Sequence, residues 1–148
     1  MLKLRIVCVG RRARDPLLDA ADRYLERLTR FARASIERVR EGTIDSERDA
    51  IAARLKGSGR IIALDEHGKQ STSQQVATQL AQWERDGVKE VAFLIGGANG
   101  LHPELKKAAG QTMALSQMTL PHRLAQVVLL EQLYRAFTIV RRQPYHRD

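Results

Sequence analysis

Residues 91–100 read Val-Ala-Phe-Leu-Ile-Gly-Gly-Ala-Asn-Gly, and they carry the strongest indication of the expected fold. Its five consecutive apolar residues have the length of a strand, and a continuous apolar run favours a strand that is covered on both faces. The glycines that follow lack a Cβ, so the backbone can turn sharply and approach a ligand closely. The stretch therefore predicts a buried parallel strand that opens into a tight loop.

Further strand patterns lie before and after this stretch. Residues 2–9 alternate apolar and polar side chains up to Gly10, and residues 60–64 form another short apolar run before the turn-like residues 65–69. Residues 34–40 alternate imperfectly among charges, which is typical of an edge strand. Residues 113–120 predict a last strand and a loop.

Helical patterns lie between the strands. Asp15 followed by Pro16 predicts a helix start, because aspartate caps helices and proline suits their first turn. Further helices are predicted after a capping box at residues 46–49 and ending near Gly57, from about Ser73 to Gly87, from Pro103, and over residues 123–141. Strands that alternate with helices predict an α/β fold, a mainly parallel sheet with helices on both faces, in a single domain over residues 1–148.

The last helix carries more apolar surface than one sheet face needs. Its apolar residues are Leu124, Val127, Val128, Leu129, Leu130, Leu133, Tyr134 and Phe137. Because they cover more than one face of the helix, we expect a partner subunit to cover the second face, and hence a homodimer. The alternative is a helix that is fully buried within one copy.

Composition indicates an ordinary globular protein. The chain has 148 residues, of which 43% are hydrophobic and 28% charged, and it contains one cysteine, Cys8, so no disulfide can form within it. Apolar runs fall well short of the roughly 18 residues that span a bilayer. We therefore expect a cytoplasmic protein with no membrane partner.

Positive charge gathers in the first and last parts of the chain. Residues 1–60 carry 15 Lys and Arg against 9 Asp and Glu, residues 61–120 carry 5 against 6, and residues 121–148 carry 5 against 2. Such a distribution suits a protein whose periphery binds a polyanion in a salt-sensitive manner. A basic surface that serves solubility alone is the competing interpretation.

Three of the predicted strand ends carry residues suited to a pocket, because ligands of parallel sheets bind beyond the carboxyl ends of strands. They are residues 64–65, 96–97 and 115–120. The glycine loop at residues 96–100 matches neither a Walker loop nor a dinucleotide fingerprint, and it lacks a cation to pair with phosphate. A plain tight turn is the alternative.

The sequence contains no motif typical of a metal site or of an α/β-hydrolase. His67, His102, His122 and His146 are too scattered for a metal-binding spacing, and no G-x-S-x-G sequence is present. Residues 141–148 combine cations, an aromatic ring and an imidazole, the groups that hold a phosphate, stack on a base and move a proton. A frayed basic terminus is the alternative there.

Several motifs in this order resemble the RlmH family of the SPOUT methyltransferases over essentially the whole chain. They are Leu64-Asp65 with Gly68-Lys69, Leu94-Ile95-Gly96-Gly97 with Gly100, Leu115-Ser116, Thr119-Leu120-Pro121-His122, Glu131-Gln132-Leu133-Tyr134-Arg135-Ala136 and Pro144-Tyr145-His146-Arg147. The resemblance implies a C-terminal trefoil knot, a homodimer and S-adenosyl-L-methionine as cofactor. On the family pattern, the cofactor-binding residues are Leu64, Gly96, Leu115, Ser116, Gln117, Met118, Thr119 and Leu120.

The family's reaction is methylation of N3 of a pseudouridine in large-subunit ribosomal RNA, at the intersubunit bridge of the assembled ribosome. The resemblance therefore implies the ribosome as partner and a catalytic role for the tail. His146 is the candidate base, Arg135 could stabilise the developing anion, and Tyr145 could stack or hydrogen-bond. A catalytically silent, basic ribosome-associated protein is the alternative function.

Overall fold

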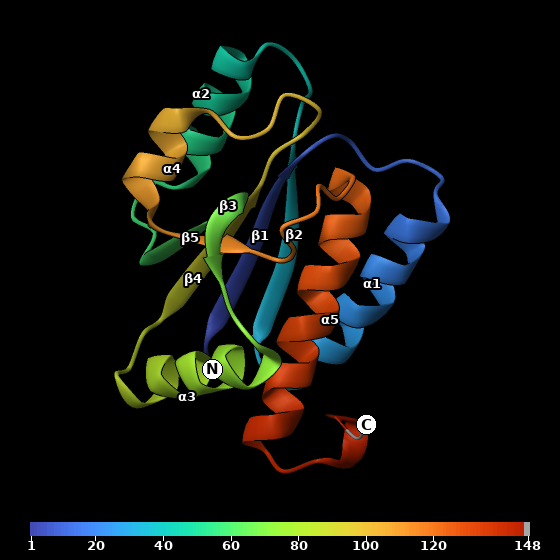
Figure 1. Cartoon of the computed structure of the whole chain (residues 1–148), viewed down its shortest axis with the longest axis vertical. Helices are drawn as coiled ribbons and strands as arrows, with labels where there is room; N and C mark the ends of the chain where they lie inside the picture. Colours follow the sequence, from blue (N-terminus) through green and yellow to red (C-terminus); the bar gives the residue numbers. More distant parts are fainter. Residues whose placement is uncertain (147–148) are drawn as a thin grey trace.

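One parallel sheet organises the molecule. A computed structural model describes residues 1–146, with the backbone alone for His146. Within this range the strands are β1 (Lys3–Val9), β2 (Arg33–Val39), β3 (Arg60–Gln70), β4 (Glu90–Ile95) and β5 (Gly110–Ala114). They lie in the order β2-β1-β4-β3-β5, with every neighbouring pair parallel (Figure 1). The α/β prediction is confirmed, and β2 is an edge strand as expected.

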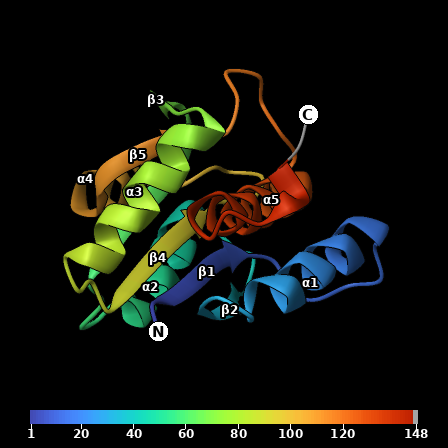
Figure 2. The ribbon, with the colours of Figure 1, turned by 90° about the horizontal axis from the view of Figure 1, so that it is seen from below.

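Helices cover both faces of this sheet (Figure 2). On one face lie α1 (Pro16–Leu28), α3 (Ser73–Arg85) and α5 (His122–Val140), and on the other lie α2 (Ile44–Arg54) and α4 (Pro103–Ala109). Alternation along β1 supplies both cores, because Leu4, Ile6 and Cys8 pack with the first group of helices. Val7 and Val9 pack with the second group. A short 3-10 helix, η1 (Pro144–His146), follows α5.

Strand β3 continues through residues that the sequence predicted as a turn. Both Leu64 and Lys69 pair with Met113 of β5, so residues 65–68 bulge out of the strand rather than end it. At Gly68 a Cβ atom would lie 2.9 Å from the backbone nitrogen of Met113, so only glycine lets the chain return this close to β5. Turn-forming residues here build a bulge within the strand rather than a turn that ends it.

The start of α2 also differs from its prediction. Its N-cap is Thr43, whose hydroxyl accepts a hydrogen bond from the Ser46 backbone at 3.1 Å, so the expected capping box at residues 46–49 is wrong. Glu47 instead reaches back to accept from the Gly42 backbone at 3.0 Å. The cap at Asp15 is confirmed by a hydrogen bond from the Leu17 backbone at 2.7 Å.

Helix α5 lies between α1 and α3 and is largely buried within one copy. Leu130 and Phe137 are both fully buried, and the Phe137 ring stacks on Phe31 with 5.4 Å between centroids. Neighbouring helices of the same copy therefore cover most of the apolar surface that we expected a partner to cover, and Leu124 is one of the residues that stay half-buried. Val127 and Val128 are also only half-buried.

Candidate functional site

The bulge of β3, the carboxyl end of β4 and the segment after β5 meet around one cavity of about 420 Å³. Its walls come from the β3 bulge, the glycine loop that follows β4, residues 115–120, and the start of α5. Of the residues expected to hold a cofactor, the structure places Leu64, Gly96, Leu115, Ser116, Met118, Thr119 and Leu120 on the wall. Gln117 does not line the cavity.

The glycine loop folds back on itself at the end of β4. A Cβ at Gly96 would lie 2.5 Å from the carbonyl carbon of Gly100, and Gly100 itself has a φ of 70°. The backbone N–H of Gly100 donates to the carbonyl of Gly97 at 3.0 Å. Gly96 is therefore required because the loop touches itself there, whereas the sequence suggested close approach of a ligand.

Polar side chains from separate elements meet at the cavity. Lys106 of α4 forms an ion pair with Asp65 at 3.4 Å, and the Thr119 hydroxyl donates to the Glu66 carboxylate across the cavity wall. His122, the first residue of α5, also lines the wall. The position of Asp65 after an apolar run predicts it at this site, whereas no sequence pattern predicts Lys106, which reaches the site from a helix on the other face of the sheet.

The predicted catalytic residues gather around the other end of α5. Arg135 places its guanidinium carbon 5.2 Å from the centre of the Tyr145 ring and pairs with Glu131 at 2.7 Å. Tyr145 packs edge-on against Tyr134, and the hydroxyls of Tyr145 and Tyr24 lie 3.4 Å apart. The side chain of His146, and Arg147 entirely, lie outside the described residues.

Burial and the contact with Tyr24 raise the pKa of Tyr145 above its ordinary value. This phenol therefore stays protonated at neutral pH, where it can donate a hydrogen bond or stack but does not act as a base. Arg135 is cationic throughout, because guanidinium groups keep their proton in proteins. Neither side chain is suited to accept a proton.

Within one copy the two groups of residues lie apart. Helix α5 has 19 residues, which at 1.5 Å per residue corresponds to a length of about 28 Å between the cavity at its start and the tail after its end. Figure 1 shows the C-terminus at the far end of α5 from the loop that enters this helix. The structure therefore does not bring Tyr145 or Arg135 to the cavity of their own copy.

Comparison with known proteins identifies relatives over the whole described chain. The family model described as "Predicted SPOUT methyltransferase" matches residues 2–146. The protein named ribosomal RNA large subunit methyltransferase H from Polynucleobacter asymbioticus is 44% identical over 99% of this chain and 100% of its own length. A protein of the same name from Paraburkholderia phymatum is 42% identical, and the match covers 99% of each chain.

Solved structures share the fold at low sequence identity. A probable methylase family protein from Haemophilus influenzae superposes with a TM-score of 0.61 at 10% identity, over 98% of this chain and 70% of that one. A putative methylase family protein from Neisseria gonorrhoeae gives 0.57 at 14% identity, over 88% and 81% of the two chains. Among the described residues, no helix is long and apolar enough to cross a membrane, and no cluster of possible metal ligands occurs.

Proposed function

Because this chain belongs to the SPOUT methyltransferase family, we propose that it transfers a methyl group from S-adenosyl-L-methionine to large-subunit ribosomal RNA, at N3 of a pseudouridine on the assembled ribosome. The observation that carries this proposal is the cavity in which the strand-end segments meet. Family membership also implies the C-terminal trefoil knot that the sequence resemblance predicts. We assign this activity to a single domain over residues 1–148, in the cytoplasm where ribosomes work.

The cavity has the size and the lining that this cofactor needs. A volume of about 420 Å³ lies within the range of small-molecule sites. Leu64, Leu115 and Leu120 would hold the apolar part of the cofactor, and the backbone at Gly96 and Ser116 would bind its polar groups. Because Lys106 compensates Asp65, the Glu66 carboxylate supplies the negative charge on the wall that suits a sulfonium cation.

Chemistry at the target base determines what the tail must do. The bound cofactor supplies an electrophilic methyl group, while N3 of pseudouridine carries a proton and is a poor nucleophile until that proton leaves. We assign proton acceptance to His146, because an imidazole titrates near neutrality and Tyr145 is held protonated. Arg135 then stabilises the negative charge that develops on the ring, and Tyr145 stacks beside it.

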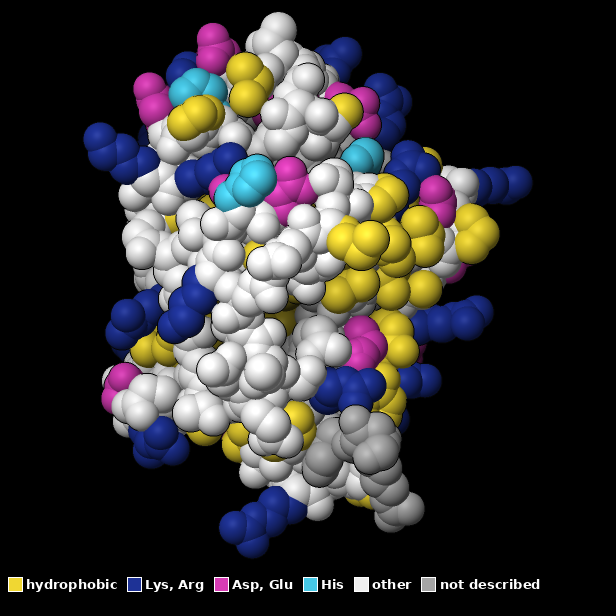
Figure 3. All heavy atoms as spheres, viewed as in Figure 1, with side chains coloured by type: hydrophobic (Ala, Val, Ile, Leu, Met, Phe, Trp, Pro, Cys, Tyr) yellow, Lys and Arg dark blue, Asp and Glu magenta, His cyan; other side chains and the backbone are white. Residues whose placement is uncertain are grey.

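These roles require a second copy of the chain. The length of α5 separates the tail from the cavity of its own copy. We therefore assign each active site to the cavity of one copy and the tail of the other. Hydrophobic side chains gather over the first half of α5 and the adjoining side of α1, as Figure 3 shows. Half-buried Val127 and Val128, with Met118 at 78% exposure, supply apolar surface for a homodimer.

The experiment that tests this function is methyl transfer to a defined ribosome. Purified ribosomes that contain the pseudouridine but lack its methyl group are incubated with the protein and labelled S-adenosyl-L-methionine, and the labelled nucleotide is mapped. We expect label at N3 of a single pseudouridine. Label on transfer RNA or on protein would contradict the substrate, and ribosome binding without any cofactor affinity would indicate the silent basic protein instead.

A further inference from the structure

A second concave site lies at the same edge of the sheet as the cofactor cavity, beyond the ends of β1 and β2. Arg11, Arg12, Arg38 and Arg40 line it together with Val39, and its volume is about 520 Å³. We call this site the arginine cleft. Its shape depends on Gly10, which has a φ of 108° and donates its backbone N–H to the Val39 carbonyl at 2.8 Å. That turn brings the residues after β1 beside those after β2.

Two of the four arginines have partners within the protein. Arg12 forms ion pairs with Asp19 at 2.7 Å and Asp22 at 3.0 Å, so acidic side chains of α1 compensate its charge. Arg38 donates to the amide oxygen of Gln126 at 3.1 Å, which holds the side chain in place but leaves its charge uncompensated. The structure therefore orients Arg38 and neutralises Arg12.

The other two arginines, Arg11 and Arg40, are available to bind a ligand. Within residues 1–146, neither Arg11 nor Arg40 forms an ion pair or hydrogen bond, and both side chains are exposed. Glu41 borders the same cluster and offsets one positive charge. With Arg12 neutralised, Arg11, Arg38 and Arg40 against Glu41 leave a net charge of about +2 in one concave site, which favours an anion. A guanidinium matches a phosphate with two parallel hydrogen bonds.

The arginine cleft adjoins the cofactor cavity. A Cβ at Gly10 would lie 3.8 Å from Nε2 of His122, which lines the cavity. The sheet has the strand order β2-β1-β4-β3-β5. The cleft lies beyond the ends of β2 and β1, and the cavity lies beside β4 and β3, the next two strands in that order. Because neighbouring strands lie about 4.8 Å apart, the two sites are separated by roughly 10 Å. One RNA strand can therefore reach both sites.

We propose that the arginine cleft binds a backbone phosphate of the RNA strand whose target base enters the adjoining cavity. This assignment rests on the proposed function and adds to it a substrate-binding site on the side of β1 and β2. Arg11 and Arg40 contact the phosphate, and Arg38 is a fixed cation behind them. The site contributes to placing the substrate and takes no part in binding S-adenosyl-L-methionine.

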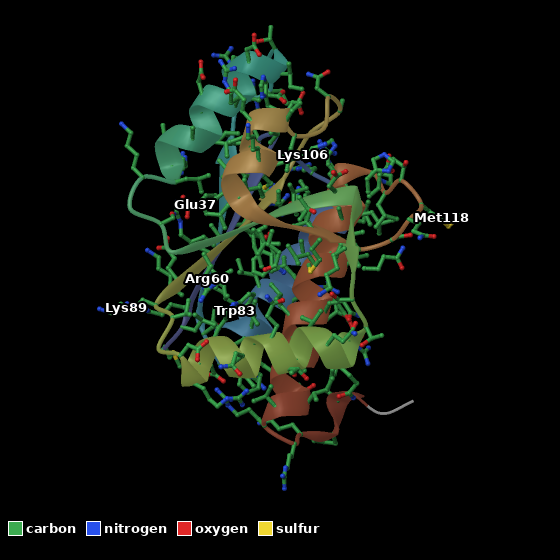
Figure 4. All side chains as sticks on the ribbon, turned by 60° about the vertical axis from the view of Figure 1, so that its left-hand side comes forward. Glu37, Arg60, Trp83, Lys89, Lys106 and Met118 are labelled. Atoms are coloured by element: carbon green, nitrogen blue, oxygen red, sulfur yellow. The ribbon has the colours of Figure 1, made fainter. Side chains whose placement is uncertain are left out.

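The test compares two double variants of equal charge. Arg11→Gln with Arg40→Gln removes the uncommitted arginines of the cleft. The control, Arg33→Gln with Arg60→Gln, removes two exposed arginines from the starts of β2 and β3, at the opposite edge of the sheet. Figure 4 shows Arg60 at the other end of the sheet from Lys106 of the cofactor cavity. Affinity for purified ribosomes is measured over a series of salt concentrations.

We expect the cleft variant to bind ribosomes on the order of tenfold more weakly, with the slope of log affinity against log salt reduced by about 1. The control should change both quantities much less. For methyl transfer, the cleft variant should raise KM for ribosomes while kcat stays close to wild type. Calorimetry should find its affinity for S-adenosyl-L-methionine unchanged, which separates this result from a damaged cofactor cavity.

Glu41→Gln gives a test of opposite sign, because it removes the negative charge beside the cleft. Ribosome affinity should rise in this variant. Equal losses in the cleft and control variants would overturn the proposal, and so would wild-type binding that does not depend on salt. If the cleft variant alone binds weakly but no pseudouridine is methylated, the phosphate site stands and the proposed reaction fails.

Discussion

Arg5 is a charged side chain held almost out of solvent inside the sheet, at 9% exposure. Its guanidinium donates to Glu37 at 2.5 and 2.9 Å, to Glu90 at 3.2 Å and to the hydroxyl of Ser58 at 2.8 Å. The hydrogen bonds from Arg5 hold the pKa of Glu37 below its ordinary value. A buried cation of this kind depends on its partners, because an uncompensated charge in the interior is costly.

Stability should therefore depend on Glu37 in acid. A carboxylate whose folded pKa is depressed stabilises the fold above its unfolded pKa, about 4.3, and this contribution is lost as the pH falls through the folded pKa. We expect Glu37→Gln to cost about 2–3 kcal/mol at pH 7 and to flatten the loss of stability below pH 5. Urea unfolding at several pH values measures both effects. The exposed Glu26→Gln is the control, and an equal acid dependence in the two variants would refute the assignment.

The tail gives the second prediction at the scale of single residues. If His146 is the base, the single-turnover rate should rise with pH through the titration of an imidazole, and His146→Ala should abolish that inflection. Tyr145→Phe keeps the ring beside Arg135 and should retain the inflection, because the tyrosine remains protonated in this range. An unchanged inflection in His146→Ala would exclude histidine as the base and favour action of Arg135 on the imide.

At the scale of elements, the glycine loop after β4 makes a prediction about the cofactor cavity. Gly96→Ala places a Cβ against the Gly100 backbone, so the loop must open and its contacts with ligand must change. We expect affinity for S-adenosyl-L-methionine to fall at least tenfold, measured by calorimetry. Gly57→Ala is the control, because its φ of 75° also strains an alanine but no atom lies near.

That control should lose on the order of 1 kcal/mol of stability and keep its cofactor affinity. If Gly96→Ala binds S-adenosyl-L-methionine as the wild type does while remaining folded, the cavity is not the cofactor site. Circular dichroism and thermal unfolding of both variants show whether either has lost its fold.

The elements show where sequence patterns suffice. The apolar run at residues 91–95 predicted β4, and Asp15 with Pro16 predicted the start of α1, because strong local signals agree there with the fold. The bulge at residues 65–68 was read as a turn, because the same residue types serve both and only pairing with β5 distinguishes them. Strand ends predicted the cavity, but the approach of Lys106 depends on tertiary packing.

At the scale of the whole molecule, the apolar surface of α5 serves either the core of one copy or contact with a second copy. Leu130 is fully buried within one copy, whereas Val128 is only half-buried, in a cavity between α5 and the start of α3. Leu130→Asp should therefore unfold the protein, because it buries an unpaired charge. Val128→Asp should leave a folded chain and dissociate the dimer. Analytical ultracentrifugation of both variants tests this, and a wild type that stays monomeric at micromolar concentration would contradict the proposed dimer.

In the proposed dimer, the cavity of one copy and the tail of the other form each active site, and mixing two inactive variants tests this arrangement. One variant carries Gly96→Val in the cavity, and the other lacks residues 144–148. When the two variants are co-expressed in equal amounts, about half of the dimers contain one copy of each. Each mixed dimer has one complete site out of two, so methylation of ribosomal RNA should recover to about a quarter of the wild-type rate. If the mixture stays as inactive as each variant alone while mixed dimers form, the shared site is contradicted.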